Sequence, residues 1–149
     1  MEIREVMTES VVTASLHAPV RDVAALMRDR NVGSVVLVDE HGVPAALITD
    51  RDLAVSVLAE GHGGDVPASG HASAPVVTGA PTMAIEAATE LMTRHAIRRL
   101  PVVERGRLCG IVTLDDIAAR IGDADLAQRL TARITRAALP QFYFHDRGG

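Results

Sequence analysis

Ala46-Leu47-Ile48-Thr49-Asp50-Arg51-Asp52-Leu53 is a stretch that the chain repeats downstream as Gly110-Ile111-Val112-Thr113-Leu114-Asp115-Asp116-Ile117. Each copy has three small or apolar residues, a Thr, two variable residues, an Asp and a branched apolar residue. Thr49 and Thr113 are 64 residues apart, and so are Asp52 and Asp116. An apolar run that ends in Thr predicts a strand that turns directly into a helix. Because the pattern occurs twice, it predicts a fold built from two similar repeats.

The Thr-x-x-Asp pattern at each junction has two interpretations. The first is a ligand site, because the unpaired N–H groups and the positive dipole end of a helix start attract anions. A Thr hydroxyl and an Asp carboxylate beside them can hold a phosphate and a ribose diol. The second is a capping box, in which the Thr side chain bonds forward and the Asp side chain bonds back. The residue types alone leave both interpretations open.

The first repeat shows the element order β-α-β-β-α. Apolar residues at helical spacing predict a helix over 20–30, directly after Pro19. Continuous apolar runs predict buried strands, and the last strand leads into a helix over 50–60. The other predicted elements are a short helix in 1–9, strands at 11–13, 34–38 and 44–49, a turn at 39–42, and a linker rich in Gly, Ser, Pro and Ala over 61–74.

The second repeat matches the first at an offset of 65, which falls to 64 after a turn that is one residue shorter. Val76-Val77-Thr78 corresponds to the first strand, Val11-Val12-Thr13. We therefore divide the chain into a first repeat (1–64), a second repeat (65–122), and a C-terminal helix and tail (123–149). A half of about 60 residues is marginal alone. We expect an α/β (α+β) fold in which the two repeats pack with pseudo-twofold symmetry and the junctions face clefts between them.

The last predicted helix spans 125–138 and has an apolar stripe with Arg residues beside it. The stripe consists of Leu126, Leu130, Ile134 and Ala137, and the Arg residues are Arg129, Arg133 and Arg136. This helix either packs on its own domain with a solvated Arg edge, or offers a spare apolar face to a dimer partner or an acidic partner. The tail at 141–149 is expected to be frayed.

The composition argues against nucleic acid and membrane as partners. The chain has a net charge of −4, so no overall basic field attracts anionic surfaces. Its three aromatic residues, Phe142, Tyr143 and Phe144, all lie in the tail. The core must therefore be aliphatic, and the aromatic side chains on which nucleic-acid modules stack bases are missing.

The sequence shows no set of residues typical of an enzyme or a metal site. All 15 basic residues are Arg, which excludes a P-loop, Schiff-base or kinase lysine. Asp115 and Asp116 are adjacent on a helix and diverge by about 100°, which makes them a poor acid/base pair. The six His residues are scattered and Cys109 is the one Cys, so we expect no catalytic and no metal-binding residues.

The same features indicate a cytoplasmic protein. Cys109 lies in an apolar run, where it is expected to act as a small buried hydrophobe. A single Cys excludes an internal disulfide and fits a reducing compartment. No apolar run approaches 18 residues, and the N-terminus lacks the pattern of a signal peptide.

Taken in order and duplicated, these motifs resemble a tandem CBS-domain pair, also called a Bateman module. The layout is similar to that of the small stand-alone bacterial members of the family. The resemblance covers about residues 3–122. It rests on Val6-Met7-Thr8, Val11-Val12-Thr13 and the stretches 33–38, 48–53, 95–103 and 110–117.

The resemblance implies a regulatory sensor rather than a catalyst. Such pairs bind AMP, ADP, ATP or S-adenosylmethionine in the clefts between repeats, as regulatory ligands and not as required cofactors. It implies that Asp52 and Asp116 accept hydrogen bonds from ribose hydroxyls. It implies that the phosphate faces Thr49 and Thr113, with Arg51, Arg98 or Arg99 nearby. The adenine would be held near Val12-Thr13, Val35-Val36, Val77-Thr78 and Leu100-Pro101.

The two repeats differ in ways that rank the two sites. Gly110 stands where the first repeat has Ala46, and a missing side chain lets a ligand approach the backbone. Arg98 and Arg99 precede the second junction and suit phosphate. We therefore expect Thr113 and Asp116 to form the better site, and Thr49 and Asp52 the weaker one. The start of the second repeat, 65–74, lacks a Val-Met-Thr motif.

A second functional hypothesis is an interaction module that binds no small molecule. Such a module works by dimerisation or by docking on a protein target that the sequence does not identify. A homodimer through the helical faces of the repeats is expected in either case, because the chain is a small unit with an apolar helical stripe. Binding of an adenine nucleotide discriminates between the two hypotheses.

Overall fold

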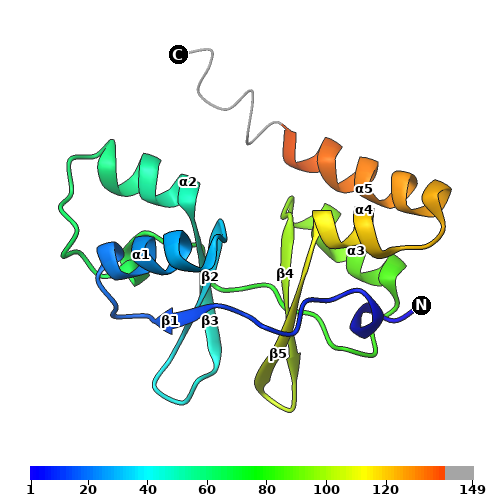
Figure 1. Ribbon diagram of the computed structural model, residues 1–149, viewed down its shortest axis with the longest axis horizontal. Helices are drawn as coiled ribbons and strands as arrows, with labels where there is room; N and C mark the ends of the chain where they lie inside the picture. The colour runs from blue at the N-terminus through cyan, green and yellow to red at the C-terminus, as the bar shows by residue number, and fades with distance from the viewer. Residues whose placement is uncertain (140–149) are drawn as a thin grey trace. The chain divides into compact units, whose positions relative to one another are not determined.

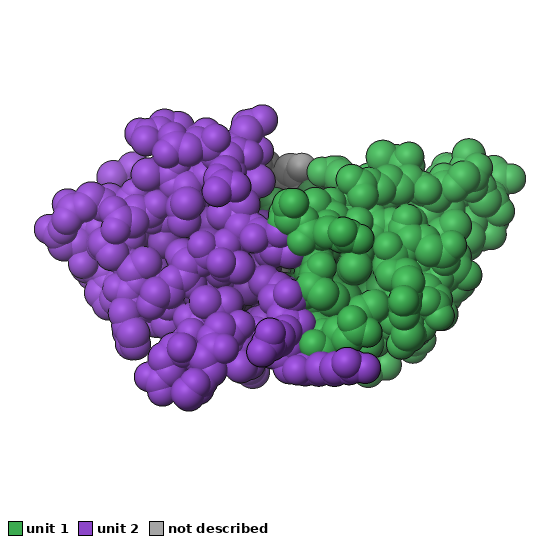
Figure 2. All heavy atoms as spheres, turned by 60° about the horizontal axis from the view of Figure 1, so that its bottom comes forward, with its two compact units in different colours: residues 1–10, 77–104, 109–149 green, residues 11–76, 105–108 purple. Residues whose placement is uncertain are grey.

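The computed structural model describes residues 1–139 and divides them into two compact units (Figures 1 and 2). Unit 1 comprises, of the described residues, Met1–Ser10, Val77–Glu104 and 109–139. Unit 2 comprises Val11–Val76 and Arg105–Leu108. Each unit has its own aliphatic core, and the fold is α+β as predicted. The repeat boundaries and the pseudo-twofold packing stay predictions, and the tail at 141–149 lies outside the described residues.

Unit 2 is built on a three-stranded sheet. Its strands, in spatial order, are β1 (Thr13–Ser15), β2 (Ser34–Val38) and β3 (Pro44–Thr49). β1 and β2 run parallel, and β2 and β3 run antiparallel. Helix α1 (Val20–Arg30) buries Val20, Val23 and Met27, as its apolar period predicts. It ends at Asn31, which has the left-handed φ of 53° common after helices.

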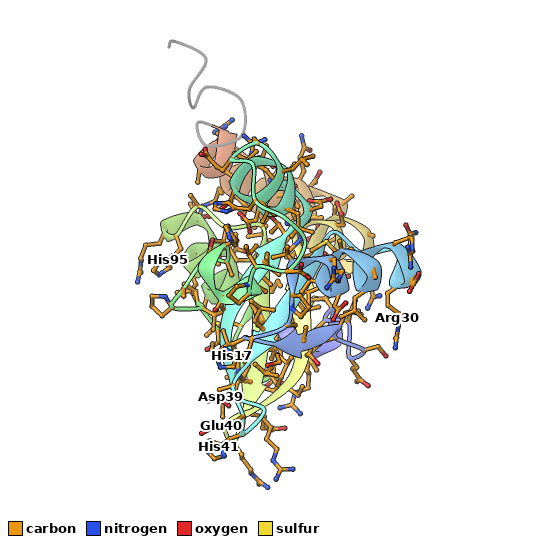
Figure 3. All side chains as sticks on the ribbon, turned by 90° about the vertical axis from the view of Figure 1, so that its left-hand side faces the viewer. His17, Arg30, Asp39, Glu40, His41 and His95 are labelled. Carbon is orange, nitrogen blue, oxygen red and sulfur yellow. The ribbon has the colours of Figure 1, made fainter. Side chains whose placement is uncertain are left out.

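A carboxylate organises the turn between β2 and β3. Figure 3 shows Asp39, Glu40 and His41 together at the tip of this hairpin. Oδ1 of Asp39 accepts the backbone N–H groups of His41 and Val43, both at 2.9 Å. The bond from Val43 lowers the pKa of Asp39 below its ordinary value, and the bond from His41 acts in the same direction. Gly42 completes the turn with a φ of 77°, which favours glycine.

The helix predicted over 50–60 consists of two parts. Helix α2 (Asp50–Asp52) is a single α-helical turn, and η2 (Leu53–Leu58) continues it in π-helical form. Val57 is buried in the core of unit 2. Val55 and Leu58 are 51% and 76% exposed, which is unusual for large apolar side chains of a helix in this aliphatic protein.

The two-stranded sheet of β4 (Arg99–Glu104) and β5 (Arg107–Thr113) belongs to unit 1, except for the first two residues of β5. The strand predicted at 76–78 is wrong in the structure. In its place Gly79 makes an isolated parallel bridge with Val102, with 2.9 Å bonds from Gly79 N to Pro101 O and from Val103 N to Gly79 O. Glycine weakens a strand, and Pro81 cannot donate to a ladder, so pairing stops after this bridge.

The helices of unit 1 form a layer of three. Helix α5 (Ala124–Leu139) packs along α3 (Ile85–Arg94) and α4 (Leu114–Arg120), as Figure 1 shows. Leu130 and Ile134 of α5 are 4% and 0% exposed. Of the two interpretations of this helix, packing on its own domain is therefore confirmed. The expectation of a spare apolar stripe is wrong, because the stripe is buried against α3 and α4.

Two short arms complete the units. The arm Met1–Ser10 belongs to unit 1, where a 3-10 turn, η1 (Ile3–Glu5), replaces the helix predicted in 1–9. Thr8 pairs with Ile111 through two backbone bonds of 2.9 Å. The side chains of Ile3 and Val6 are buried in the core of unit 1. The apolar spacing in this segment therefore reflects packing against that core and not an amphipathic α-helix.

The second arm repeats this arrangement in unit 2, inside the segment that was predicted to be a linker. It contains a 3-10 turn, η3 (Ala68–Gly70), whose Ala68 is fully buried. Ser73 pairs with Leu47 through backbone bonds of 2.9 and 3.1 Å. Pro19 and Pro67 also form a bridge, which corresponds to the bridge of Glu2 and Ala84 in unit 1. The linker is thus an ordered part of the fold, because its backbone completes the edge of β3.

We expect Asp39→Asn to destabilise the chain at neutral pH and to have less effect in acid. The folded pKa of Asp39 is lowered, so its contribution is present above the unfolded pKa of about 3.9 and is lost as pH falls through the folded pKa. Urea unfolding of both proteins at neutral and acidic pH measures this. A loss of stability that is the same at both pH values would show that the carboxylate charge is not involved.

Candidate functional site

Both junctions form complete capping boxes. In unit 1, Thr113 Oγ1 accepts from Asp116 N at 3.0 Å, and Asp116 Oδ2 accepts from Thr113 N at 3.0 Å. In unit 2, the bond from Asp52 N to Thr49 Oγ1 is 3.1 Å and the bond from Thr49 N to Asp52 Oδ2 is 2.9 Å. The capping interpretation is therefore confirmed. Each box uses one carboxylate oxygen for the cap and leaves Oδ1 of the Asp for other partners.

Unit 1 brings its candidate residues to two neighbouring places. Leu114 N donates to Arg98 O at 3.0 Å, which puts the start of β4 beside the start of α4. Arg99 follows as the first residue of β4. Val77 and Thr78 precede the Gly79 bridge and therefore approach β4 near Pro101. The residues expected to bind the phosphate thus lie near the start of α4, and the residues expected to bind the adenine lie along β4.

Unit 2 gathers its own candidate residues in the same way. Thr13 is the register partner of Val36, and Val36 N donates to Val12 O at 3.1 Å. Ser34 is the partner of Thr49, and Asp50 N donates to Gly33 O at 3.0 Å. Arg51 and Asp52 follow in α2. Every residue proposed from the sequence for the first junction is therefore in one unit.

Two further residues of unit 1 contact the candidate carboxylate. Thr8 Oγ1 donates to Asp116 Oδ1 at 3.3 Å, and Arg120 Nε lies 3.5 Å from the same oxygen. Arg120 Nη1 also donates to the carbonyl oxygens of Met7 and Val6, at 3.0 and 3.4 Å. Asp116 is 8% exposed as a result. Sequence reasoning missed both contacts, although the spacing of Asp116 and Arg120 (i, i+4) is a signal for the second.

The equivalent positions of unit 2 are occupied differently. Ser73 corresponds to Thr8, and Ser56 corresponds to Arg120. The Ser56 hydroxyl shares a 2.7 Å hydrogen bond with His71 Nδ1, and the His71 ring packs edge-on against His62. This arm is therefore fastened by a hydrogen bond between a hydroxyl and an imidazole, and not by the carboxylate of Asp52.

The space beside Gly110 is filled by the chain itself. A Cβ atom at this position would lie 2.6 Å from Met7 Sδ and 3.1 Å from the carbonyl oxygen of Thr8. The missing side chain thus admits the arm, and the expectation that it admits a ligand is not supported. In unit 2 the corresponding pair is Ala46 with Ala72. The ranking of the two sites stays a prediction that now rests on Arg98 and Arg99 alone.

A shallow hollow of 430 Å³ lies on unit 2 between α1 and the α2–η2 segment. Its apolar lining includes Val20, Ala24, Leu53, Val57 and Leu58. The corresponding helices of unit 1, α3 and α4, are covered by α5. The two helical faces of the chain therefore differ, because a single C-terminal helix covers one of them.

Two further observations concern the Cys109 thiol and the side chains that could bind a metal ion. Burial raises the pKa of the Cys109 thiol, with a smaller effect of Glu104 in the same direction, and Sγ donates to Val102 O at 3.4 Å. The thiol is thus kept in its less nucleophilic form. Within residues 1–139, no three His, Cys, Asp or Glu side chains are grouped so that they could hold a metal ion. No helix in that range is long and apolar enough to cross a membrane.

Comparison with known proteins gives one family. The family model described as CBS domain matches residues 3–59 and 65–123. The CBS domain-containing protein YhcV of Bacillus subtilis is 41% identical over 116 residues, which cover 78% of this chain and 82% of that protein. Hypoxic response protein 1 of Mycobacterium tuberculosis is 27% identical over 137 residues, with coverages of 91% and 96%. Some other curated relatives are longer, and the chain spans 61% or less of them.

The fold is also similar to solved structures. The CBS domain protein PAE2072 from Pyrobaculum aerophilum, complexed with AMP, is 26% identical and has a TM-score of 0.76. The similarity covers 89% of this chain and 99% of that one.

We expect Gly110→Ala to lower the free energy of unfolding by about 1–3 kcal/mol, as overpacking typically does. The added Cβ would meet Met7 Sδ and the fixed carbonyl of Thr8. Combining it with Met7→Ala recreates the Ala–Ala pair of unit 2 and should recover part of the loss. Double-mutant denaturation measures the coupling, with Ala46→Gly as the control in unit 2. Strictly additive effects of the two changes would contradict the proposed contact.

Proposed function

The chain belongs to the CBS domain family and carries two of its repeats, and on that premise we propose that it is a regulatory protein that senses an adenosine-containing ligand. The observation that carries this proposal is the pair of Thr–Asp junctions, each with an Oδ1 atom outside its capping box and with the expected neighbours in the same unit. The relative PAE2072, solved with AMP, supports the ligand class. We propose AMP, ADP, ATP or S-adenosylmethionine as the regulatory ligand.

We propose the following roles for the site residues. Asp52 and Asp116 accept hydrogen bonds from the ribose hydroxyls, because a carboxylate can serve the helix cap and a ligand with different lone pairs. Thr49 and Thr113 face the phosphate with Arg51, Arg98 or Arg99, whose planar guanidinium groups suit bidentate phosphate contacts. Val12, Thr13, Val36, Val77, Thr78 and Pro101 hold the adenine.

The protein acts in this proposal through binding and not through turnover. Burial raises the pKa of the Cys109 thiol, which makes it a poor nucleophile, and the proposal gives the Ser56–His71 hydrogen bond the task of fastening the arm of unit 2. A cytoplasmic location, suggested by the single Cys, stays a prediction. The ligand then changes the conformation or the assembly of the chain, since a ligand shifts an equilibrium only between states that it binds unequally.

Calorimetry with AMP tests the ligand function. We expect Asp52→Ala and Asp116→Ala each to weaken AMP binding at their own site by about ten- to a hundredfold, the loss typical of a charge-assisted bond. Asp115→Ala is the matched control, because Asp115 is adjacent to Asp116 but is exposed and outside the box. If the Asp residues only cap their helices, both variants lose about 1 kcal/mol of stability and keep the affinity of the wild type.

The hollow on unit 2 favours a second candidate function, assembly through helical faces. Leu58 lines this hollow and is 76% exposed, and exposed apolar area on a soluble domain commonly marks an interface. The buried stripe of α5 leaves the unit 2 face as the one we propose for a homodimer. In this alternative the chain binds no nucleotide and works by dimerising or by docking on a protein target.

We expect Leu58→Asp to convert the dimer to a monomer, because the substitution puts a charge into an apolar interface. Light scattering at micromolar concentration measures the change, with Val43→Asp as a control at an exposed apolar residue in the β2–β3 turn. A wild-type chain that is monomeric under these conditions would contradict the dimer. Dimerisation that survives Leu58→Asp would place the interface elsewhere.

A further inference from the structure

The arm Met1–Ser10 is fastened to unit 1 by both backbone and side-chain bonds. The backbone bonds run from Ile3 N to Met83 O, from Thr8 N to Ile111 O and from Ile111 N to Thr8 O, each 2.9 Å long. The side-chain bonds are the Thr8 hydroxyl on Asp116 Oδ1 and the Arg120 guanidinium on the carbonyls of Val6 and Met7. The side-chain group fastens the arm through the same carboxylate that the proposed function assigns to the ligand.

Both oxygens of the Asp116 carboxylate have neighbours within unit 1. Oδ2 is taken by the N–H group of Thr113, and Oδ1 faces both the Thr8 hydroxyl and Nε of Arg120. A carboxylate oxygen offers about two acceptor sites. Asp116 is 8% exposed, so a ligand hydroxyl that approaches Oδ1 meets the Thr8 hydroxyl and Nε of Arg120 there. The Thr8 hydroxyl is the weaker neighbour, since it is uncharged and 3.3 Å away.

In unit 2 the arm does not use the carboxylate of the junction. Its arm is held by the same backbone pairing, at Ser73 and Leu47, but its side-chain bond joins Ser56 to His71. The Oδ1 atom of Asp52 therefore serves no arm, and Asp52 is less buried than Asp116. The chain thus contains one junction whose carboxylate is coupled to an arm and one whose carboxylate is not.

We propose that Thr8 and a ribose hydroxyl compete for Asp116 Oδ1, so that ligand binding at unit 1 loosens the N-terminal arm. This proposal rests on the proposed function and adds its regulation. Coupling between two binding events is reciprocal. The ligand therefore weakens the docking of Met1–Ser10. In turn, a change that weakens the Thr8–Asp116 hydrogen bond strengthens the binding of the ligand. The arm of unit 2 does not respond in this way.

Affinity for AMP in the full-length Asp52→Ala background tests the competition, because only the unit 1 site then reports. Thr8→Val keeps the shape of the side chain and removes the hydroxyl, and should tighten AMP binding by about three- to tenfold, the usual worth of one hydrogen bond. Thr8→Ser restores the hydroxyl and should return the affinity to that of the Asp52→Ala parent. Ser73→Ala, the matched change in the other arm, should leave it unaltered.

Hydrogen exchange of the same Asp52→Ala protein gives an independent readout. AMP should speed amide exchange in Met1–Ser10 and leave 66–76 unaffected. Unchanged or weaker AMP binding in Thr8→Val, or protection of the arm by AMP, would overturn the competition. AMP binding by the wild type but not by Asp52→Ala would overturn it as well. If the wild type binds none of the four adenosine ligands, the proposed function fails and the competition fails with it.

Discussion

The fold depends on how the free edge of the last strand in each unit is paired. β3 and β5 would each expose unpaired N–H and C=O groups at one edge, and unpaired edges are a liability for a small sheet. In both units a short arm supplies the missing partner, through Thr8 on Ile111 and Ser73 on Leu47. Each arm comes directly before the core segment of one unit in the sequence but belongs to the other unit. The chain therefore leaves unit 1 after Ser10, forms most of unit 2 with residues 11–76, and returns to unit 1 at Val77.

The same junction serves stability and, in our proposal, recognition. The capping box satisfies orphan N–H groups at the start of a helix that follows a strand without a loop. It also fixes the Asp carboxylate, because Oδ2 is held by the Thr backbone. A side chain fixed in this way loses little further freedom when a ligand binds. The two interpretations of Thr-x-x-Asp are thus compatible, and the confirmed cap is a physical basis for the proposed site.

The two units have a similar arrangement of strands and helices but differ in the contacts that complete each unit. Unit 1 receives α5 over its helices, a bulky Met7 against Gly110, and an ionic latch at Asp116. Unit 2 has a hollow on its helical face, an Ala46–Ala72 pair, and a Ser56–His71 hydrogen bond. The differences at Gly110 and at Asp116 replace one interaction by another at a matched position, whereas α5 is an added element of unit 1. In our proposals the two units therefore have different tasks. Unit 2 offers a helical face for assembly, and unit 1 couples ligand binding to the arm Met1–Ser10.

Much of this protein could be predicted from its sequence, because the signals are local. The apolar period of α1, the runs of β2 and β3, the Thr–Asp boxes and the 64-residue spacing each depend on neighbouring residues, and the structure has them where they were expected. The order of motifs was sufficient to indicate the family. Tertiary structure alone decided which strand edge each arm completes, what fills the space at Gly110, and that Thr8 reaches Asp116. These contacts join residues more than 100 positions apart, or pair an arm with a strand, and side-chain periodicity records which face is buried but not which segment covers it.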